Sequence, residues 1–261
     1  MINRDSLRPR LRARYTVAIL CVTFAFAIVR PSAGDPQPGI LGNDDRRVIE
    51  QLSTPWSAIG QVNVAGYRRI TSWCTGSLIA TNLVITAAHC VMDPWSRKPF
   101  PLHQIHFLAG VRGSSSLGHS TANCLHFSPE YEYIGPNEHG RVFLRDVVLI
   151  VLRDDLTNIA PLELDRAEIQ SSDISLVHAS YPADRRYVLS GNFGCHLLAR
   201  TPYLWVTDCD TNAGSSGGPV FIQSKEGLKL AAIMVGVAER SGSVAVPVPN
   251  WIDVVTEWNC P

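Results

Sequence analysis

A serine flanked by glycines, in Gly214-Ser215-Ser216-Gly217-Gly218-Pro219, lies downstream of every histidine in the chain. Small residues on both sides indicate an exposed hydroxyl whose neighbouring backbone N–H groups are free to hold an anion. The same letters also satisfy the Gly-x-Ser-x-Gly turn of lipases and esterases, in which the histidine base follows the serine along the chain. Because the last histidine is His196, a base for Ser216 must come from upstream, which excludes that fold.

One upstream histidine has the setting of a base. It lies in Thr86-Ala87-Ala88-His89-Cys90, after a short apolar run. A serine hydroxyl needs both a base and a third group that orients the base. Asp146 leads the apolar run 147–152 and can supply that group. Asp154 and Asp155 are the alternative carboxylates, but they follow the far end of the run and would face away from a cleft at its start.

In these three segments, taken in this order, the chain resembles the trypsin-like (chymotrypsin-fold) serine proteases from about Pro55 to Trp258. The resemblance implies that His89 is the base, Asp146 its orienting carboxylate and Ser216 the nucleophile, with the N–H groups of Gly214 and Ser216 as the oxyanion hole. It implies an exported serine endopeptidase that forms an acyl-enzyme on protein or peptide substrates and needs no cofactor. The alternative is a catalytically silent binding or regulatory protein on the same fold.

Short apolar runs alternate with Gly, Pro, Asn and Ser along the chain, which predicts an all-β fold. The resemblance refines this to two packed six-stranded antiparallel β-barrels. The first would carry His89 and Asp146, and the second Ser216. Residues 250–258 have the apolar spacing of a short C-terminal helix.

The N-terminus predicts export. Residues 1–33 combine a basic start, a 14-residue apolar stretch (Thr16–Val29) and small residues, as in a secretory signal. As a helix the stretch spans about 21 Å, short of the roughly 30 Å membrane core, although an uncleaved anchor remains the alternative. We expect residues 34–54 to be a flexible leader or propeptide, residues 55–261 to form the protease domain, and the mature protein to be secreted or periplasmic with no stable membrane association.

Charge argues against a nucleic-acid partner. Residues 1–33 hold six arginines and one aspartate, so 17 basic and 22 acidic residues remain, a formal charge of about −5. After residue 33, adjacent basic residues occur only in pairs, and there is no run of three or more.

Seven cysteines are present, one of them (Cys21) in the apolar stretch, and the other six form an even set typical of disulfides in exported proteins. Sequence alone allows about 15 pairings. The resemblance implies Cys74–Cys90, which closes the loop carrying His89. Cys195–Cys209 is assigned by proximity to the specificity region and Cys124–Cys260 by exclusion. The sequence contains no CxxC pair of the kind that binds zinc, and we expect no metal.

One residue departs from the family pattern. Trypsin-like enzymes carry an aspartate just before the nucleophile, which pairs with the new N-terminal amine after activation cleavage; here that position is Ser215. Arg46-Arg47-Val48-Ile49 still looks like a cleavage site. We therefore expect that activity does not depend on an amine–aspartate pair. The bacterial glutamyl-endopeptidase-like branch also lacks this aspartate, and residues 55–60 and 208–211 resemble it.

Substrate preference has two interpretations. Asp210 lies six residues before Ser216, where trypsin-like enzymes place an acidic pocket floor that favours Lys or Arg, or it is a structural aspartate beside Cys209. Glutamate-preferring relatives have a histidine on the strand after the nucleophile. Residues 232–237 contain no histidine, so a preference for glutamate is disfavoured. The specificity pocket is expected to include Asp210, Thr211, Val235, Gly236 and Val237.

Overall fold

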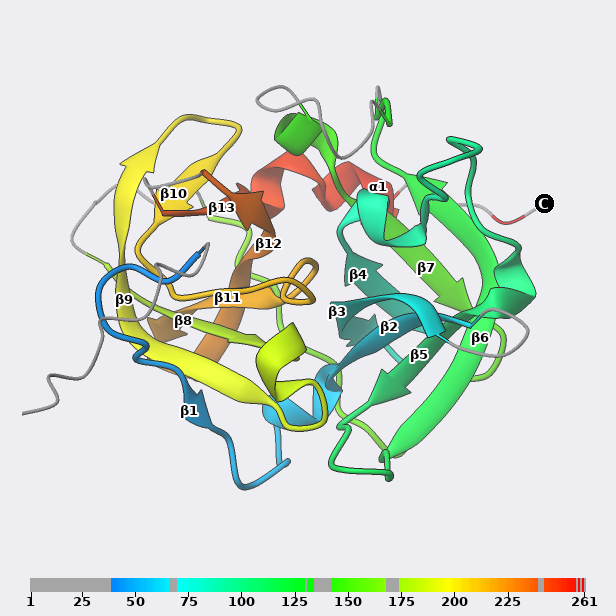
Figure 1. Ribbon diagram of the computed structural model, residues 1–261, viewed down its shortest axis with the longest axis horizontal. Helices are drawn as coiled ribbons and strands as arrows, with labels where there is room; N and C mark the ends of the chain where they lie inside the picture. The colour runs from blue at the N-terminus through cyan, green and yellow to red at the C-terminus, as the bar shows by residue number, and fades with distance from the viewer. Residues whose placement is uncertain are drawn as a thin grey trace, which may run out of the picture. The chain divides into compact units, whose positions relative to one another are not determined.

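The computed structural model describes residues 39–65, 70–129, 131–133, 142–167, 174–238, 242–256, 258 and 260. Its strands form two closed six-stranded antiparallel β-barrels (Figure 1). The fold predicted from the sequence is confirmed. Residues 1–33 and the first part of the expected leader lie outside the described residues.

The first barrel closes in the order β2-β3-β4-β7-β6-β5. Its strands are β2 (Ile59–Ala65), β3 (Ile70–Ala80), β4 (Leu83–Thr86), β5 (Ile105–Ala109), β6 (Gly118–Phe127) and β7 (Val148–Leu152). Gly60 lies opposite Gly76 in the β2–β3 pair. A Cβ at Gly60 would come within 2.5 Å of the Phe107 ring. The paired glycines therefore make room for the aromatic ring inside the barrel.

The second barrel closes because β9 pairs with β8 as well as with β10. Its strands are β8 (Ser175–Ser180), β9 (Ser190–Arg200), β10 (Trp205–Thr207), β11 (Pro219–Ser224), β12 (Gly227–Val237) and β13 (Ser243–Pro247). A two-residue strand, β1 (Arg47–Val48), pairs antiparallel with β9, with Arg47 opposite Gly191. Buried side chains from both barrels belong to one continuous apolar cluster, which includes Phe107 and Phe221.

Helical segments are short. The 3₁₀ turns are η1 (Trp56–Ala58), η2 (Ala88–Val91), η3 (Leu102–Gln104), η4 (Val142–Arg145), η5 (Ala183–Arg185) and η6 (Val248–Asn250). The predicted C-terminal helix is present as α1 (Ile252–Thr256). It follows the 3₁₀ turn η6, so the regular helix is shorter than the residues 250–258 expected. Trp251 and Val254 bury its inner face.

The leader differs from the expectation of a flexible segment in its described part. Residues 39–50 lie along the second barrel, where they form β1 and accept or donate several backbone hydrogen bonds (Figure 1). The Ile49 N–H donates to the Leu189 carbonyl at 2.9 Å, and the Thr211 N–H donates to the Gly39 carbonyl at 2.8 Å. Satisfied backbone groups of this kind hold a segment without regular structure of its own. We call residues 39–50 the docked leader.

Three disulfides join Cys74 to Cys90, Cys124 to Cys260 and Cys195 to Cys209. The first ties β3 to η2, and the last ties β9 to the segment that follows β10. The second joins β6 of the first barrel to the C-terminal end of the chain, which has just left the second barrel. Covalent closure therefore reinforces the two regions nearest the candidate site and the path of the chain terminus.

A buried histidine in the second barrel predicts acid sensitivity. His178 on β8 is 1% exposed, and its Nδ1 lies 3.0 Å from the Pro219 carbonyl oxygen. Burial lowers the pKa of His178 to about 4; the hydrogen bond to Pro219 opposes this and the charge of Arg46 adds to it. The unfolded chain therefore takes up a proton near pH 6.5 that the folded chain accepts only near pH 4. Stability falls as pH falls through this window, by up to about 1.4 kcal/mol per pH unit.

We expect His178→Asn to flatten this pH dependence by about one proton, because the amide can still donate to Pro219 but does not titrate. The measurement is the free energy of unfolding in denaturant between pH 7 and pH 4. His103→Asn, at an exposed position, is the matched control. An unchanged slope in His178→Asn would assign the acid sensitivity to another group.

Candidate active site

Strand pairing in the first barrel brings His89 and Asp146 together. β4 ends at Thr86, which lies opposite Val148 at the start of β7. His89 follows β4 in the turn η2, and Asp146 immediately precedes β7, so both residues leave the barrel at the same edge. The Cys74–Cys90 disulfide anchors η2 to β3.

Asp146 holds His89 through two contacts. One carboxylate oxygen accepts the backbone N–H of His89 at 2.8 Å, and the other lies 2.6 Å from the Nδ1 atom of the imidazole. The Asp146 side chain is 1% exposed, whereas that of His89 is 32% exposed. The pair is thus buried on the carboxylate side and open on the imidazole side. With Nδ1 bonded to a carboxylate, Nε2 is left as the proton acceptor.

Electrostatics favour a charged imidazole at this position. Burial lowers the pKa of His89, but the negative charge of Asp146 and its hydrogen bond outweigh burial and leave the pKa raised above its ordinary value. A raised pKa makes the imidazole a stronger base. It also stabilises the imidazolium that forms when a proton is taken up.

Ser216 lies in a tight turn beside this pair. Its carbonyl oxygen accepts the Thr75 N–H at 2.8 Å and lies 3.9 Å from the Cys90 sulfur. The Ser215 N–H donates to Asn212 and the Gly217 N–H to Met234. Within the part of the chain that the structure describes, no hydrogen bond engages the N–H groups of Gly214 or Ser216. Two backbone donors beside the serine hydroxyl are therefore free to bind an anion.

The glycines in this turn are required by space as well as by conformation. Gly214 has φ +88°, and a Cβ there would lie 2.7 Å from the Trp73 Nε1 atom. Gly217 has φ +81°, and a Cβ there would lie 2.0 Å from the Thr75 carbonyl oxygen. A side chain at Gly214 would therefore collide with Trp73.

Ser215 is buried among small polar groups. It accepts a hydrogen bond from the Ser180 hydroxyl at 2.9 Å and one from the Asn212 N–H at 3.3 Å. At this site the hydroxyl ties the turn to β8 and to its own start. The sequence shows that Ser215 stands where the family has an aspartate. The partners of Ser215, Ser180 and Asn212, could not be predicted, because neither belongs to a recognisable motif.

A cavity of about 280 Å³ opens beside Ser216. The described residues that line it carry no charge: Thr211, Asn212, Ala213, Ser216, Met234, Gly236 and Val237. Of the residues expected in a specificity pocket, Thr211, Gly236 and Val237 line it. Val235 does not, because it is buried in the apolar cluster on the other face of β12.

Asp210, which the first of the two interpretations would put at the floor of such a pocket, is absent from the described lining. Its carboxylate oxygens accept the backbone N–H groups of Leu41 at 3.0 Å and Asp45 at 2.8 Å, both in the docked leader. Burial raises the pKa of Asp210, those two N–H groups lower it, and the charges of Asp44 and Asp45 raise it. The geometry corresponds to the structural interpretation of Asp210.

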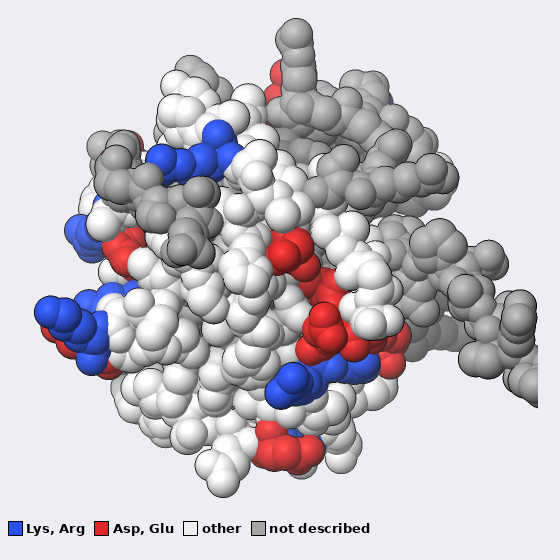
Figure 2. All heavy atoms as spheres, turned by 90° about the vertical axis from the view of Figure 1, so that its left-hand side faces the viewer, with Lys and Arg blue, Asp and Glu red and all other residues white. Residues whose placement is uncertain are grey.

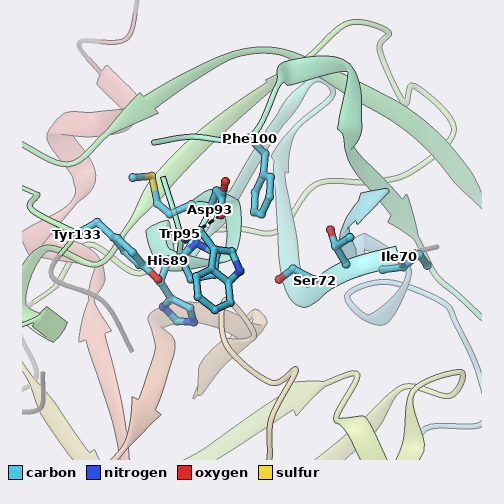
Figure 3. A pocket seen from close by; sticks show the side chains of 10 residues that line it. Ile70, Ser72, His89, Asp93, Trp95, Phe100 and Tyr133 are labelled. Carbon is cyan, nitrogen blue, oxygen red and sulfur yellow. Dashed lines mark hydrogen bonds between the residues drawn. The ribbon is translucent and has the colours of Figure 1, made fainter. Parts of the chain in front are cut away.

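A second, larger cavity of about 720 Å³ lies on the other side of His89. Its walls include Ile70, Met92, Trp95, Phe100 and Tyr133 (Figure 3). Trp95 is 93% exposed, yet it sits on an ordered turn whose Asp93 carboxylate accepts the Trp95 N–H at 2.9 Å. An exposed indole held in this way is a ready contact for an apolar group. No motif in the sequence indicates that Trp95 borders the site.

Lys and Arg lie close to Asp and Glu in small mixed clusters on the face shown in Figure 2. Among the described residues, the group of potential metal ligands is Cys74, His89 and Cys90, and both of its sulfurs are joined in a disulfide. No helix in the described ranges is long and apolar enough to cross a membrane.

Known proteins share this architecture. A family model described as "Trypsin-like peptidase domain" matches residues 74–228. Hypodermin-A from Hypoderma lineatum is 22% identical over 247 residues, covering 81% of this chain and 84% of that protein. The solved structure of a Glu endopeptidase superposes with TM-score 0.68 at 17% identity, covering 84% of this chain and 98% of the other. A thermostable serine protease from an extremophilic microorganism gives TM-score 0.56 at 20% identity, covering 74% and 91%.

Proposed function

The chain belongs to the trypsin-like peptidase family, and we propose that it is an exported serine endopeptidase with His89, Asp146 and Ser216 as its catalytic triad. The observation that carries the proposal is the double contact of one buried carboxylate with His89, at 2.8 Å to the backbone and 2.6 Å to the ring. A histidine so oriented beside a glycine-flanked serine is the arrangement that acyl transfer requires.

The proposed reaction has two steps. The Ser216 hydroxyl attacks the carbonyl carbon of the scissile peptide bond while His89 takes the hydroxyl proton. His89 then gives that proton to the departing amine, leaving an acyl group on Ser216. In the second step His89 takes a proton from water, and the resulting hydroxide equivalent attacks the acyl carbon. As the bond between that carbon and the Ser216 oxygen breaks, His89 gives the proton to the serine oxygen, which restores both residues and releases the acid product. Asp146 keeps the imidazole in the required tautomer and stabilises its charged form throughout.

The free N–H groups of Gly214 and Ser216 would stabilise the oxyanion formed in each step. One such donor contributes roughly 2.7–4 kcal/mol to the transition state. The turn that presents them is braced by hydrogen bonds from Ser215 and Gly217 to neighbouring carbonyls. The donors are therefore aimed before substrate arrives and do not have to reorganise during the reaction.

We infer that the residue on the acyl side of the scissile bond is uncharged. The cavity beside Ser216 is lined by Ala213, Met234 and Val237 with polar but neutral Thr211 and Asn212. A charged side chain would lose its hydration there without gaining a partner of opposite charge among the described residues that line the cavity. The cavity bordered by Trp95 and Phe100 would take an apolar side chain of the same substrate.

Export is part of the proposal. Three disulfides support an oxidising compartment, and the basic and apolar start of the sequence supports a secretory signal. From these two features together, we expect the protein or peptide substrates to lie outside the cytoplasm.

The activity is tested by covalent labelling with a fluorophosphonate, which reacts with an activated serine. We expect the protein recovered from the extracellular or periplasmic fraction to be labelled, and Ser216→Ala to abolish labelling, because the nucleophile is lost. Ser114→Ala, at an exposed loop serine, is the matched control. No labelling of the folded wild-type protein would instead support a catalytically silent binding protein.

The raised pKa of His89 predicts the acid limb of the pH profile. Only the neutral imidazole accepts the Ser216 proton, so kcat/KM should fall as pH drops through a value above the ordinary 6.5 of histidine. Asp146→Asn removes the charge that raises this pKa and favours the wrong tautomer, so kcat should drop about 10⁴-fold. The measurement is kcat/KM from pH 5 to pH 9; an acid limb below pH 6.5 would contradict the electrostatic argument.

Asp210→Asn separates the two roles considered for Asp210. If Asp210 holds the leader, the amide presents a donor to the N–H of Leu41 or Asp45, stability falls by about 1–3 kcal/mol, and relative rates across substrates stay unchanged. A peptide library varied at the residue before the scissile bond measures those rates, with exposed Asp253→Asn as control. A wild-type preference for Lys or Arg that disappears in Asp210→Asn would restore the pocket-floor role.

A further inference from the structure

The docked leader contacts the residues just before the turn that carries the candidate nucleophile. At the start of that turn, Asp210 accepts N–H groups from Leu41 and Asp45, and the Thr211 N–H donates to Gly39. Further along the leader, Arg46 is inserted toward the second barrel. The leader thus bonds to the residues just before the 212–216 turn, and Arg46 provides a second connection.

Arg46 is a buried cation with two carboxylate partners. Its side chain is 2% exposed. The guanidinium donates to both oxygens of Asp44, at 2.9 Å each, and to both oxygens of Asp184, at 3.1 and 2.7 Å. Arg185 braces the group by donating to the Arg46 carbonyl and to Asp44, at 2.7 Å each. Such a forked geometry fixes the position of both carboxylates.

Asp184 connects this ion-pair cluster to the turn. The Asn212 side-chain amide donates to Asp184 at 3.5 Å, and the neighbouring Ala183 N–H donates to the Ala213 carbonyl at 2.7 Å. Asn212 in turn donates its backbone N–H to the Ser215 hydroxyl and accepts the Ala213 N–H at 2.7 Å. A short path of hydrogen bonds therefore runs from Arg46 through Asp184 to residues 212–215.

We propose that Arg46, acting through Asp184, is a positioning residue that holds the 212–216 turn in the shape that aims the Gly214 and Ser216 N–H groups at the oxyanion. This rests on the proposed function. A buried ion pair between the leader and the second barrel thereby performs the ordering that an amine–aspartate pair cannot perform in a chain with Ser215. The docked leader is then part of the active enzyme, and a cut after Arg47 separates Arg46 from the catalytic domain.

The test compares Arg46→Met with Arg112→Met. Both arginines hold the leader, since Arg112 donates to the Ile49 carbonyl at 2.7 Å and to Glu50 at 3.1 Å, but no contact described for Arg112 reaches the 212–216 turn. We expect Arg46→Met to lower kcat about 10²-fold with KM nearly unchanged, because misplaced donors weaken only transition-state binding. Arg112→Met should keep wild-type kcat. Assays are run well below the melting temperature of each variant.

A second measurement separates this proposal from the proposed function. Amide hydrogen exchange in the peptide covering residues 212–217 should accelerate in Arg46→Met and not in Arg112→Met, whether or not the protein turns over substrate. Wild-type protein without turnover overturns the proposed function, whereas active wild type with equal kcat and equal exchange in both variants overturns the role of Arg46 alone. Should Arg46→Met not fold, Asp184→Asn tests the same connection, because it removes the charge and keeps the shape.

Processing gives an independent outcome. Limited proteolysis after Arg47, followed by separation of the released leader, should lower kcat and accelerate exchange in residues 212–217. A cut at this site that switches activity on from nothing would overturn the proposal, because the leader would then be inhibitory.

Discussion

The contact between Asp146 and His89 is the constraint around which the first barrel is arranged. One carboxylate accepts both the backbone N–H and the ring nitrogen of the same histidine, so it fixes the position of the residue and the direction of its ring. Neither bond can form unless β4 and β7 pair in register, because that pairing sets the separation of the two strand ends. The buried carboxylate costs solvation free energy, and the two hydrogen bonds offset that cost only in this register. Catalytic geometry and strand pairing are therefore coupled.

The second barrel solves a different problem, which is to expose two backbone donors without leaving others unpaired. In a regular strand, the N–H groups of the four residues 214–217 could not all point outward. The turn succeeds because glycines at 214 and 217 adopt positive φ, while Ser215 and Gly217 donate inward to Asn212 and Met234. Positive φ and lack of space act together here, since a side chain at Gly217 would collide with Thr75 of the first barrel. The turn is thus shaped from both barrels.

How far sequence predicts this molecule depends on the range of the interaction. His89, Asp146 and Ser216 sit in local motifs, and the short apolar runs predict the strands, so the barrels and the placement of His89 beside Asp146 followed from letters along the chain. For Asp210, sequence spacing leaves open both an acidic pocket floor and a structural aspartate. Its actual partners, Leu41 and Asp45, lie 169 and 165 residues away, and no local pattern reveals them. In the same way, nothing in the local sequence around Arg46 indicates its ion pair with Asp184, which lies 138 residues away.

The docked leader illustrates why a carboxylate at a familiar spacing need not have the familiar role. Asp210 is 2% exposed, and its carboxylate accepts two backbone N–H groups of the docked leader. Once the leader lies against the barrel, its N–H groups have already lost their water. Hydrogen bonds from them to the Asp210 carboxylate therefore require little further desolvation free energy. The leader cannot be bulkier at this point: a Cβ at Gly39 would lie 2.7 Å from the Thr211 carbonyl and 2.8 Å from a Val237 methyl. Thr211 and Val237 also line the cavity beside Ser216, so the leader supports that cavity from behind. One buried aspartate therefore links the docked leader to the wall of this cavity, because Asp210 directly precedes Thr211.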